Sequence, residues 1–176
     1  MRRFLKAAAG TALCLPGLAH AAEPPCLTPG EFTALANYAL PSVINGTASR
    51  CAPALPADAL LTRSGGELAA RYARTKASAW PGAKAAFLKV STATNPQAAD
   101  LFRSMPDPSL QQMTDGLIEG LVGQKLALKR CESVDRLVML LSPLPAESVS
   151  EVVALAVGIG AKTGKASLGA FSICQA

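Results

Sequence analysis

Signals for the start of a helix recur along this chain, and they constrain its fold more than any other feature of the sequence. Thr28 and Glu31 form a capping box around Pro29, and Ser64 and Glu67 form a second one. Two pairs of a capping residue followed by proline give the same signal later in the chain: Asn95-Pro96 and Asp107-Pro108. Helix starts at such close intervals predict a series of short helices.

The composition agrees with this reading. The chain has 34 alanines and 24 leucines, which favour helix, but only 13 valines and isoleucines, which favour strands. Its 176 residues fit one domain with a sizeable core. The sequence therefore predicts an all-α, single-domain bundle of about seven short helices.

Proline positions set the expected bounds of the early helices. Pro41 is expected to kink or restart the first helix, so that a second one covers 42–50. The capping box at Ser64 is expected to open a helix that ends at Trp80-Pro81. The later helices are expected at 82–90, from 96 onward, at 108–129, at about 134–141 and at 149–161.

The helix expected at 108–129 is the longest. Its predicted apolar face carries large side chains at helical spacing: Leu110, Met113, Leu117, Leu121 and Leu128. Gly116, Gly120 and Gly123 form a strip along the same helix. Because glycine weakens a helix interior, this strip predicts close packing against another element.

The segment 149–161 carries one charge, Glu151, and is apolar on all sides after it. It is too short to cross a bilayer, which takes about 20 residues. We expect it to be the central buried helix of the bundle. A helix that faces a partner or inserts into a membrane is the alternative.

The N-terminus has the pattern of an export signal. Arg2, Arg3 and Lys6 precede an uncharged apolar stretch at 7–18, and small residues follow in Ala19-His20-Ala21. Cleavage after Ala21 is expected to remove 1–21 and leave 22–176 as a single helical domain without a transmembrane span. The mature chain would then be periplasmic or secreted.

Cleavage would change what the chain can do chemically. Three of the 17 basic residues would be lost, which leaves 14 against 12 acidic residues, a net charge of +2. Such a charge gives no reason to expect nucleic acid as a partner. The one histidine, His20, would be lost as well, so histidine-based catalysis and imidazole metal sites are not expected.

Four cysteines would remain in the mature chain: Cys26, Cys51, Cys131 and Cys174. An even number of cysteines in an exported chain predicts two disulfides, and the absence of close pairs argues against a metal site. No metal or other cofactor is expected. If the chain folds back at Pro41 and again at Pro143, the pairs would be Cys26–Cys51 and Cys131–Cys174.

The densest group of basic residues is the one candidate binding patch: Arg63, Arg71, Arg74 and Lys76. An acidic protein, a lipid headgroup or another anionic surface could bind there. The alternative is an ordinary solvated face. This interpretation is favoured, because four charges do not make a strong electrostatic field.

Two pairs of carboxylates have a structural interpretation. Asp115 and Glu119 could serve as acid and base in glycoside cleavage, but a solvated helix face explains them better. Glu132 and Asp135 are expected to stabilise the first turn of their own helix. No residue is identified as catalytic.

These features predict an exported bacterial envelope protein that acts by binding, with another envelope protein or a second copy as its partner. An inhibitor or immunity-type protein, a chaperone-like protector and an accessory subunit all fit. The alternative is a small envelope enzyme that uses carboxylates or lysine without histidine.

Overall fold

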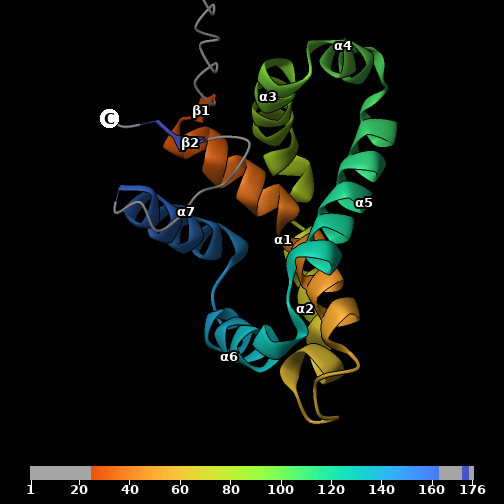
Figure 1. The fold of residues 1–176 in the computed structure, drawn as a ribbon, viewed down its shortest axis with the longest axis vertical. Coiled ribbons are helices and arrows are strands. Elements are labelled where there is room, and N and C mark those ends of the chain that lie inside the picture. Colours follow the sequence, from red (N-terminus) through yellow and green to blue (C-terminus); the bar gives the residue numbers. More distant parts are fainter. Residues whose placement is uncertain (1–24, 163–171, 175–176) are drawn as a thin grey trace, which may run out of the picture.

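The computed structural model describes residues 25–162 and 172–174. In this part, the chain forms seven α-helices, one 3-10 turn and two short strands, which confirms the all-α single-domain fold (Figure 1). The elements are β1 (Cys26–Leu27), α1 (Pro29–Cys51), α2 (Leu60–Ala73), α3 (Lys76–Thr94), α4 (Pro96–Ser104), α5 (Asp107–Lys125), η1 (Leu128–Arg130), α6 (Cys131–Leu141), α7 (Ala146–Lys162) and β2 (Ser172–Ile173).

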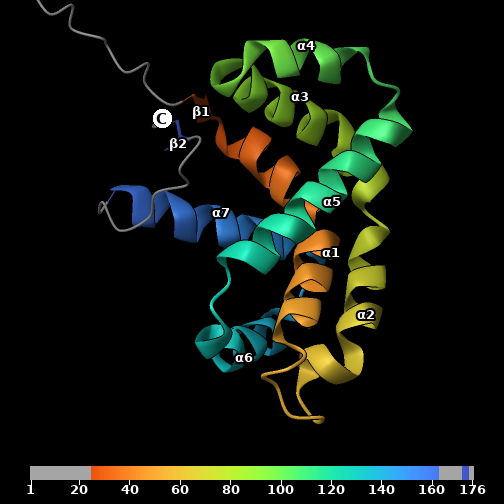
Figure 2. The same ribbon diagram turned by 45° about the vertical axis from the view of Figure 1, so that its right-hand side comes forward.

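The central helix is α1, and the prediction that 149–161 occupies the centre is wrong. The helices α2, α3, α5 and α7 all pack against α1. The capping box at its start is confirmed: Glu31 N donates to Thr28 Oγ1 over 3.2 Å, and Thr28 N donates to Glu31 Oε2 over 2.8 Å. Pro41 lies inside α1 without ending it, so the two predicted helices are one that bends near its middle (Figure 2).

Three clusters of buried apolar residues lie along α1, and α1 contributes one large buried side chain to each cluster. Phe32 packs with residues of β1, α3 and α7. Tyr38 packs with α3 and α5, and its ring centroid is 4.9 Å from that of Trp80. Ile44 packs with α2 and α7. The core is therefore built around the length of α1.

Two glycines outside the predicted strip permit close helix packing. A Cβ on Gly46 of α1 would lie 3.1 Å from the backbone of Glu119 on α5, and one on Gly82 of α3 would lie 2.7 Å from Ala34 Cβ. At Gly116, Gly120 and Gly123, an added Cβ would meet no atom within 4 Å. The prediction that this strip faces a closely packed neighbour is therefore wrong.

The second capping box is not used. Helix α2 begins at Leu60, four residues before Ser64, and has no cap from its own N-cap side chain. The backbone N–H groups of Leu60 and Leu61 donate instead to the carboxylate of Asp135 on α6. Asp135 thus stabilises the first turn of a different helix from the one predicted.

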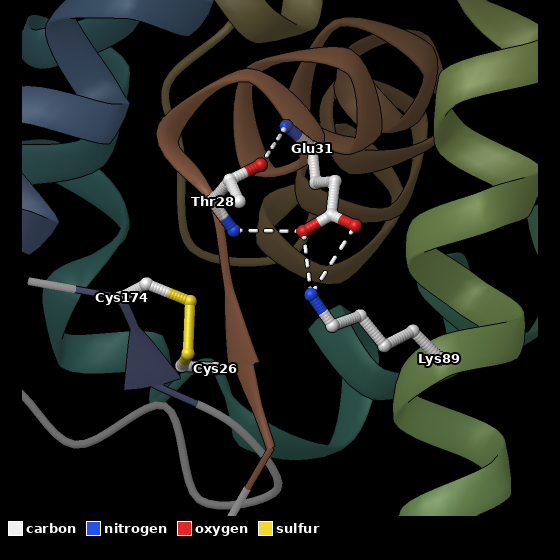
Figure 3. Close-up of a disulfide and its surroundings, with 5 residues drawn as sticks. All are labelled: Cys26, Thr28, Glu31, Lys89 and Cys174. Atoms are coloured by element: carbon white, nitrogen blue, oxygen red, sulfur yellow. Dashed lines mark hydrogen bonds and ion pairs between the residues drawn. A yellow bond between two sulfur atoms is a disulfide. The ribbon is translucent and has the colours of Figure 1, made fainter. Parts of the chain in front are cut away.

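Both predicted disulfide pairings are wrong, although the four cysteines do form two disulfides. The bonds join Cys26 to Cys174 and Cys51 to Cys131. Because α1 continues through Pro41 for 23 residues, or about 34 Å, it holds Cys26 and Cys51 at opposite ends. Cys174 reaches Cys26 because β2 pairs with β1 in parallel (Figure 3).

Candidate functional site

The predicted basic patch is divided in the structure. Arg71 and Arg74 line a shallow hollow between α2 and the turn after α6, together with Glu67 and Ser142. The Arg71 guanidinium donates a hydrogen bond to the Ser142 carbonyl oxygen and lies 5.2 Å from the ring centroid of Tyr72 on its own helix. Arg71 therefore holds the α6–α7 turn onto α2, and Arg74 is the cation of this hollow that has no ion-pair partner among the described residues.

The other two members of the patch lie elsewhere. Lys76 Nζ is 2.5 Å from Asp115 Oδ2 and 4.5 Å from the ring centroid of Tyr38. Arg63 is exposed and does not line the hollow with Arg71 and Arg74. The four side chains therefore do not converge on one anion.

A cluster of polar side chains lies where α1, α3 and α5 meet. Asp115 accepts hydrogen bonds from Ser42 Oγ over 3.0 Å and from Lys76 Nζ. Tyr38 Oη donates to the Gln111 carbonyl oxygen over 3.2 Å. Burial, with a further contribution from the Asp115 carboxylate, raises the pKa of the Tyr38 phenol above its usual range. The cluster contains a neutral phenol and an ion pair whose charges cancel. Its hydrogen bonds connect α1, α3 and α5, so we interpret it as a structural contact between these helices.

The carboxylate pair considered for acid–base catalysis does not form. Asp115 is half-buried and bonded to Lys76, whereas Glu119 is exposed and lines a second shallow hollow with Arg50. This difference between Asp115 and Glu119 could not be predicted from the sequence, because Ser42 and Lys76 lie 73 and 39 residues from Asp115. Among the described residues, no group of three or more potential metal ligands is found.

The largest departure from expectation is the exposure of large apolar side chains. Of the twelve that are exposed in the described part of the chain, all but Val43 and Leu101 lie between the middle of α5 and the end of α7. These ten are Leu117, Leu121, Leu128, Leu137, Met139, Leu140, Leu144, Val152, Leu155 and Ile159. Exposed large apolar side chains are thus concentrated in the second half of the described chain.

Helix α7 has two apolar faces. Val149, Val153 and Val157 pack into the clusters around α1. Val152, Leu155 and Ile159 have exposed fractions of 45%, 66% and 56%. Their spacing of three and four residues places them along one side of the helix, and we call them the α7 row. Sequence periodicity could not locate this face, since the run is apolar all round.

Comparisons with protein-family models, curated proteins and solved structures give no match for this chain. No described helix is long and apolar enough to cross a membrane.

Proposed function

We propose that this chain is an exported bacterial envelope protein that acts by binding another protein, and that the α7 row is its contact surface. The observation that carries the proposal is the exposure of Val152, Leu155 and Ile159 on one side of α7. Contiguous apolar side chains on the surface of a folded domain are typical of interaction sites.

The energetics favour a partner on this row. Covering a leucine that is 66% exposed, as Leu155 is, should contribute about 1–2 kcal/mol at ~25 cal/mol per Å². The opposite side of α7 already packs on α1, so the residues of the α7 row belong to a helix that is held in place by the core. A partner that covers it need not order the helix first, which reduces the entropic cost of binding.

Export is supported by the two disulfides and by the N-terminal sequence pattern. The expected product begins at Ala22 and is about 2 kDa lighter than the full chain. Intact-mass measurement on the envelope fraction of the native cell tests this. Recovery of a chain that still begins with Met1 would contradict it.

The alternative of a carboxylate- or lysine-dependent enzyme has less support. Of the four lysines and arginines that form ion pairs in the described part, Lys76, Lys84 and Lys89 each pair with a carboxylate from a distant part of the sequence. These three pairs join α3 to α5 or to α1. They are explained by the stability of the fold without reference to a substrate.

Photocrosslinking in the native envelope tests the protein-binding proposal. A photoreactive amino acid placed at Ser148, beside the α7 row, should join the chain to a defined partner. Leu155→Ser should abolish that product. Leu101→Ser should leave it unchanged, because Leu101 is similarly exposed, at 61%, but lies on α4. Equal crosslinking in the two serine variants would refute the assignment of the surface.

A further inference from the structure

A second group of exposed apolar side chains lies on α5 and on η1, which follows it in the chain. Leu117, Leu121 and Lys125 are each four residues apart, which places them along one side of α5. The two leucines have exposed fractions of 48% and 55%, and Leu128 in η1 has 40%. Two exposed cations follow Leu128 directly. We call this set the basic leucine edge: Leu117, Leu121, Lys125, Leu128, Lys129 and Arg130.

The three cations of the edge have no carboxylate partner among the described residues. The carboxylates of α5 are engaged or placed elsewhere. Asp107 pairs with Lys84, and Asp115 pairs with Lys76. Glu119 lies where α5 meets α1, with its backbone against Gly46. Glu132 follows Arg130 by two residues and forms no ion pair in the described part of the chain, so the three cations outnumber this one neighbouring carboxylate.

The edge is held firmly against the end of α1. Arg50 Nε donates a hydrogen bond to the Leu126 carbonyl oxygen over 3.1 Å, between the two halves of the edge. The disulfide between Cys51 and Cys131 then fixes the residue that follows Arg130. The backbone that carries the cations is thus anchored at two points, so this segment need not fold locally on contact.

We propose that the basic leucine edge docks on the surface of an anionic lipid bilayer. Leucines next to lysine and arginine are the combination that binds at the interface of such a bilayer, since the apolar side chains enter the acyl boundary and the cations meet lipid phosphates. Long basic side chains can reach the headgroups while their stems stay among apolar groups. The protein would lie on the membrane without crossing it.

A bilayer fits this edge better than an acidic protein does. Leu117 and Leu121 are exposed along one side of α5, and the residues that line the hollow between α1 and α5 do not include any member of the edge. A broad surface can contact such a row along its length, and no residue of the edge lines either of the two hollows described above. The edge is also separate from the α7 row, so the two proposals can fail independently.

Cosedimentation with vesicles tests the proposal. The mature chain should pellet with vesicles of phosphatidylglycerol mixed with phosphatidylcholine and stay in solution with phosphatidylcholine alone. Added salt should weaken the binding. Lys125→Glu combined with Lys129→Glu should lower the partition coefficient about tenfold or more, because each basic residue contributes to attraction by the anionic surface. Leu121→Ser should lower it as well.

Two variants provide matched controls. Arg63→Glu reverses an exposed cation on α2, and Leu101→Ser replaces an exposed leucine on α4, so neither should change the partition. Circular dichroism on every variant checks that the fold is retained. The proposal is overturned if the chain does not pellet, if both vesicle types bind equally, or if the controls lose as much binding as the edge variants. It is also overturned if the chain forms a dimer in solution that Leu121→Ser dissociates, since the edge would then be covered by a second copy.

Discussion

The carboxylate of Asp135 caps a helix that begins 75 residues earlier in the chain. Its Oδ1 accepts a hydrogen bond from Leu61 N over 2.7 Å, and Oδ2 lies 3.4 Å from Leu60 N. These N–H groups belong to the first turn of α2, where the helix has no partners of its own for them. The negative charge also lies at the positive end of the α2 dipole. One side chain of α6 therefore stabilises both the start of α2 and the contact between the two helices.

Replacing Asp135 by alanine should lower the free energy of unfolding by about 1 kcal/mol, the usual loss when a helix cap is removed. Glu132→Ala provides the control, because Glu132 is exposed in the first turn of α6 and accepts no hydrogen bond described in the structure. Urea unfolding of the three proteins measures the difference. An equal loss in both variants would show that Asp135 acts only on its own helix.

Gly82→Ala and Gly120→Ala should change stability in opposite directions. A Cβ at Gly82 would approach Ala34 Cβ to 2.7 Å, and neither α3 nor α1 can relieve that contact by rotating a side chain. We expect a loss of about 1–3 kcal/mol from overpacking. At Gly120, the added methyl group meets no atom within 4 Å, and alanine should raise stability by up to about 1 kcal/mol through helix propensity.

Thermal unfolding of both glycine variants is the measurement. A lower melting temperature for Gly120→Ala would contradict this expectation and would indicate that the three glycines of α5 face a closely packed neighbour. An unchanged value for Gly82→Ala would show that α1 and α3 can move apart at little cost.

The two disulfides should differ in how readily they are reduced. Cys26 is exposed, whereas Cys51 and Cys131 both have an exposed fraction of 0%. Since a thiolate must reach the sulfur atom that it attacks, Cys26–Cys174 should open first under graded reductant. Alkylation followed by peptide mass mapping would identify the opened pair, and a non-reduced digest should yield Cys26 joined to Cys174. A peptide joining Cys26 to Cys51 would contradict the structure.

Removing the buried disulfide should lower the free energy of unfolding by more than the Asp135→Ala substitution does. The Cys51–Cys131 bond spans 80 residues of sequence, and the double variant Cys51→Ala/Cys131→Ala should lose about 4 kcal/mol. Unfolding in urea, with Cys26–Cys174 left oxidised, measures this loss. A loss below that of Asp135→Ala would show that the cap alone holds α6 in place.

Acid should destabilise the protein in part through Glu31. The hydrogen bond from Lys89, followed by that from the Thr28 backbone, holds the pKa of Glu31 below its ordinary value of 4.5 (Figure 3). A carboxyl group with a lowered pKa contributes stability above its unfolded-state pKa, and that contribution is lost as the pH falls through the folded-state pKa. Glu31→Gln should therefore be less stable than the natural chain at neutral pH, and the difference should narrow in acid below pH 4.5.

Urea unfolding at a series of pH values tests this dependence. Glu151→Gln is the control, since Glu151 is exposed on α7 and has no hydrogen bond or ion pair described in the structure. A difference between Glu31→Gln and the natural chain that stays constant down to strong acid would exclude Glu31 as a source of the acid sensitivity.

Local signals in the sequence predicted the helices whose starts depend on neighbouring residues. Thr28 and Pro29 open α1 as expected, and Asn95 caps α4 by accepting from Ala98 N over 3.1 Å. The start of α5 at Asp107 lies one residue from the predicted position, although Asp107 pairs with Lys84 instead of capping the helix. For α1 and α4, the determining contacts lie within a few residues of sequence.

The errors arise where a distant element decides the outcome. Ser64 has the pattern of a cap, but Asp135 starts α2 earlier. Leu117 and Leu121 have the spacing of a core face, yet no element covers them in the described part of the chain. Periodicity shows which residues share a side of a helix, and it contains no information on whether another helix packs there. For the same reason, the separation of Lys76 from Arg71 and Arg74 could not be predicted.

The Cys26–Cys174 bond has a consequence for how the protein matures. In a chain that is exported N-terminus first, Cys26 emerges long before Cys174, because the two cysteines are 148 positions apart in the sequence. The first thiol it meets is that of Cys51, and oxidation in order of emergence would join the wrong two sulfur atoms. The growing α1 opposes this, because it carries the two cysteines apart as it forms. If the chain is exported as proposed, correct oxidation depends on α1 forming before Cys51 is oxidised, or on an isomerase that exchanges the early bond.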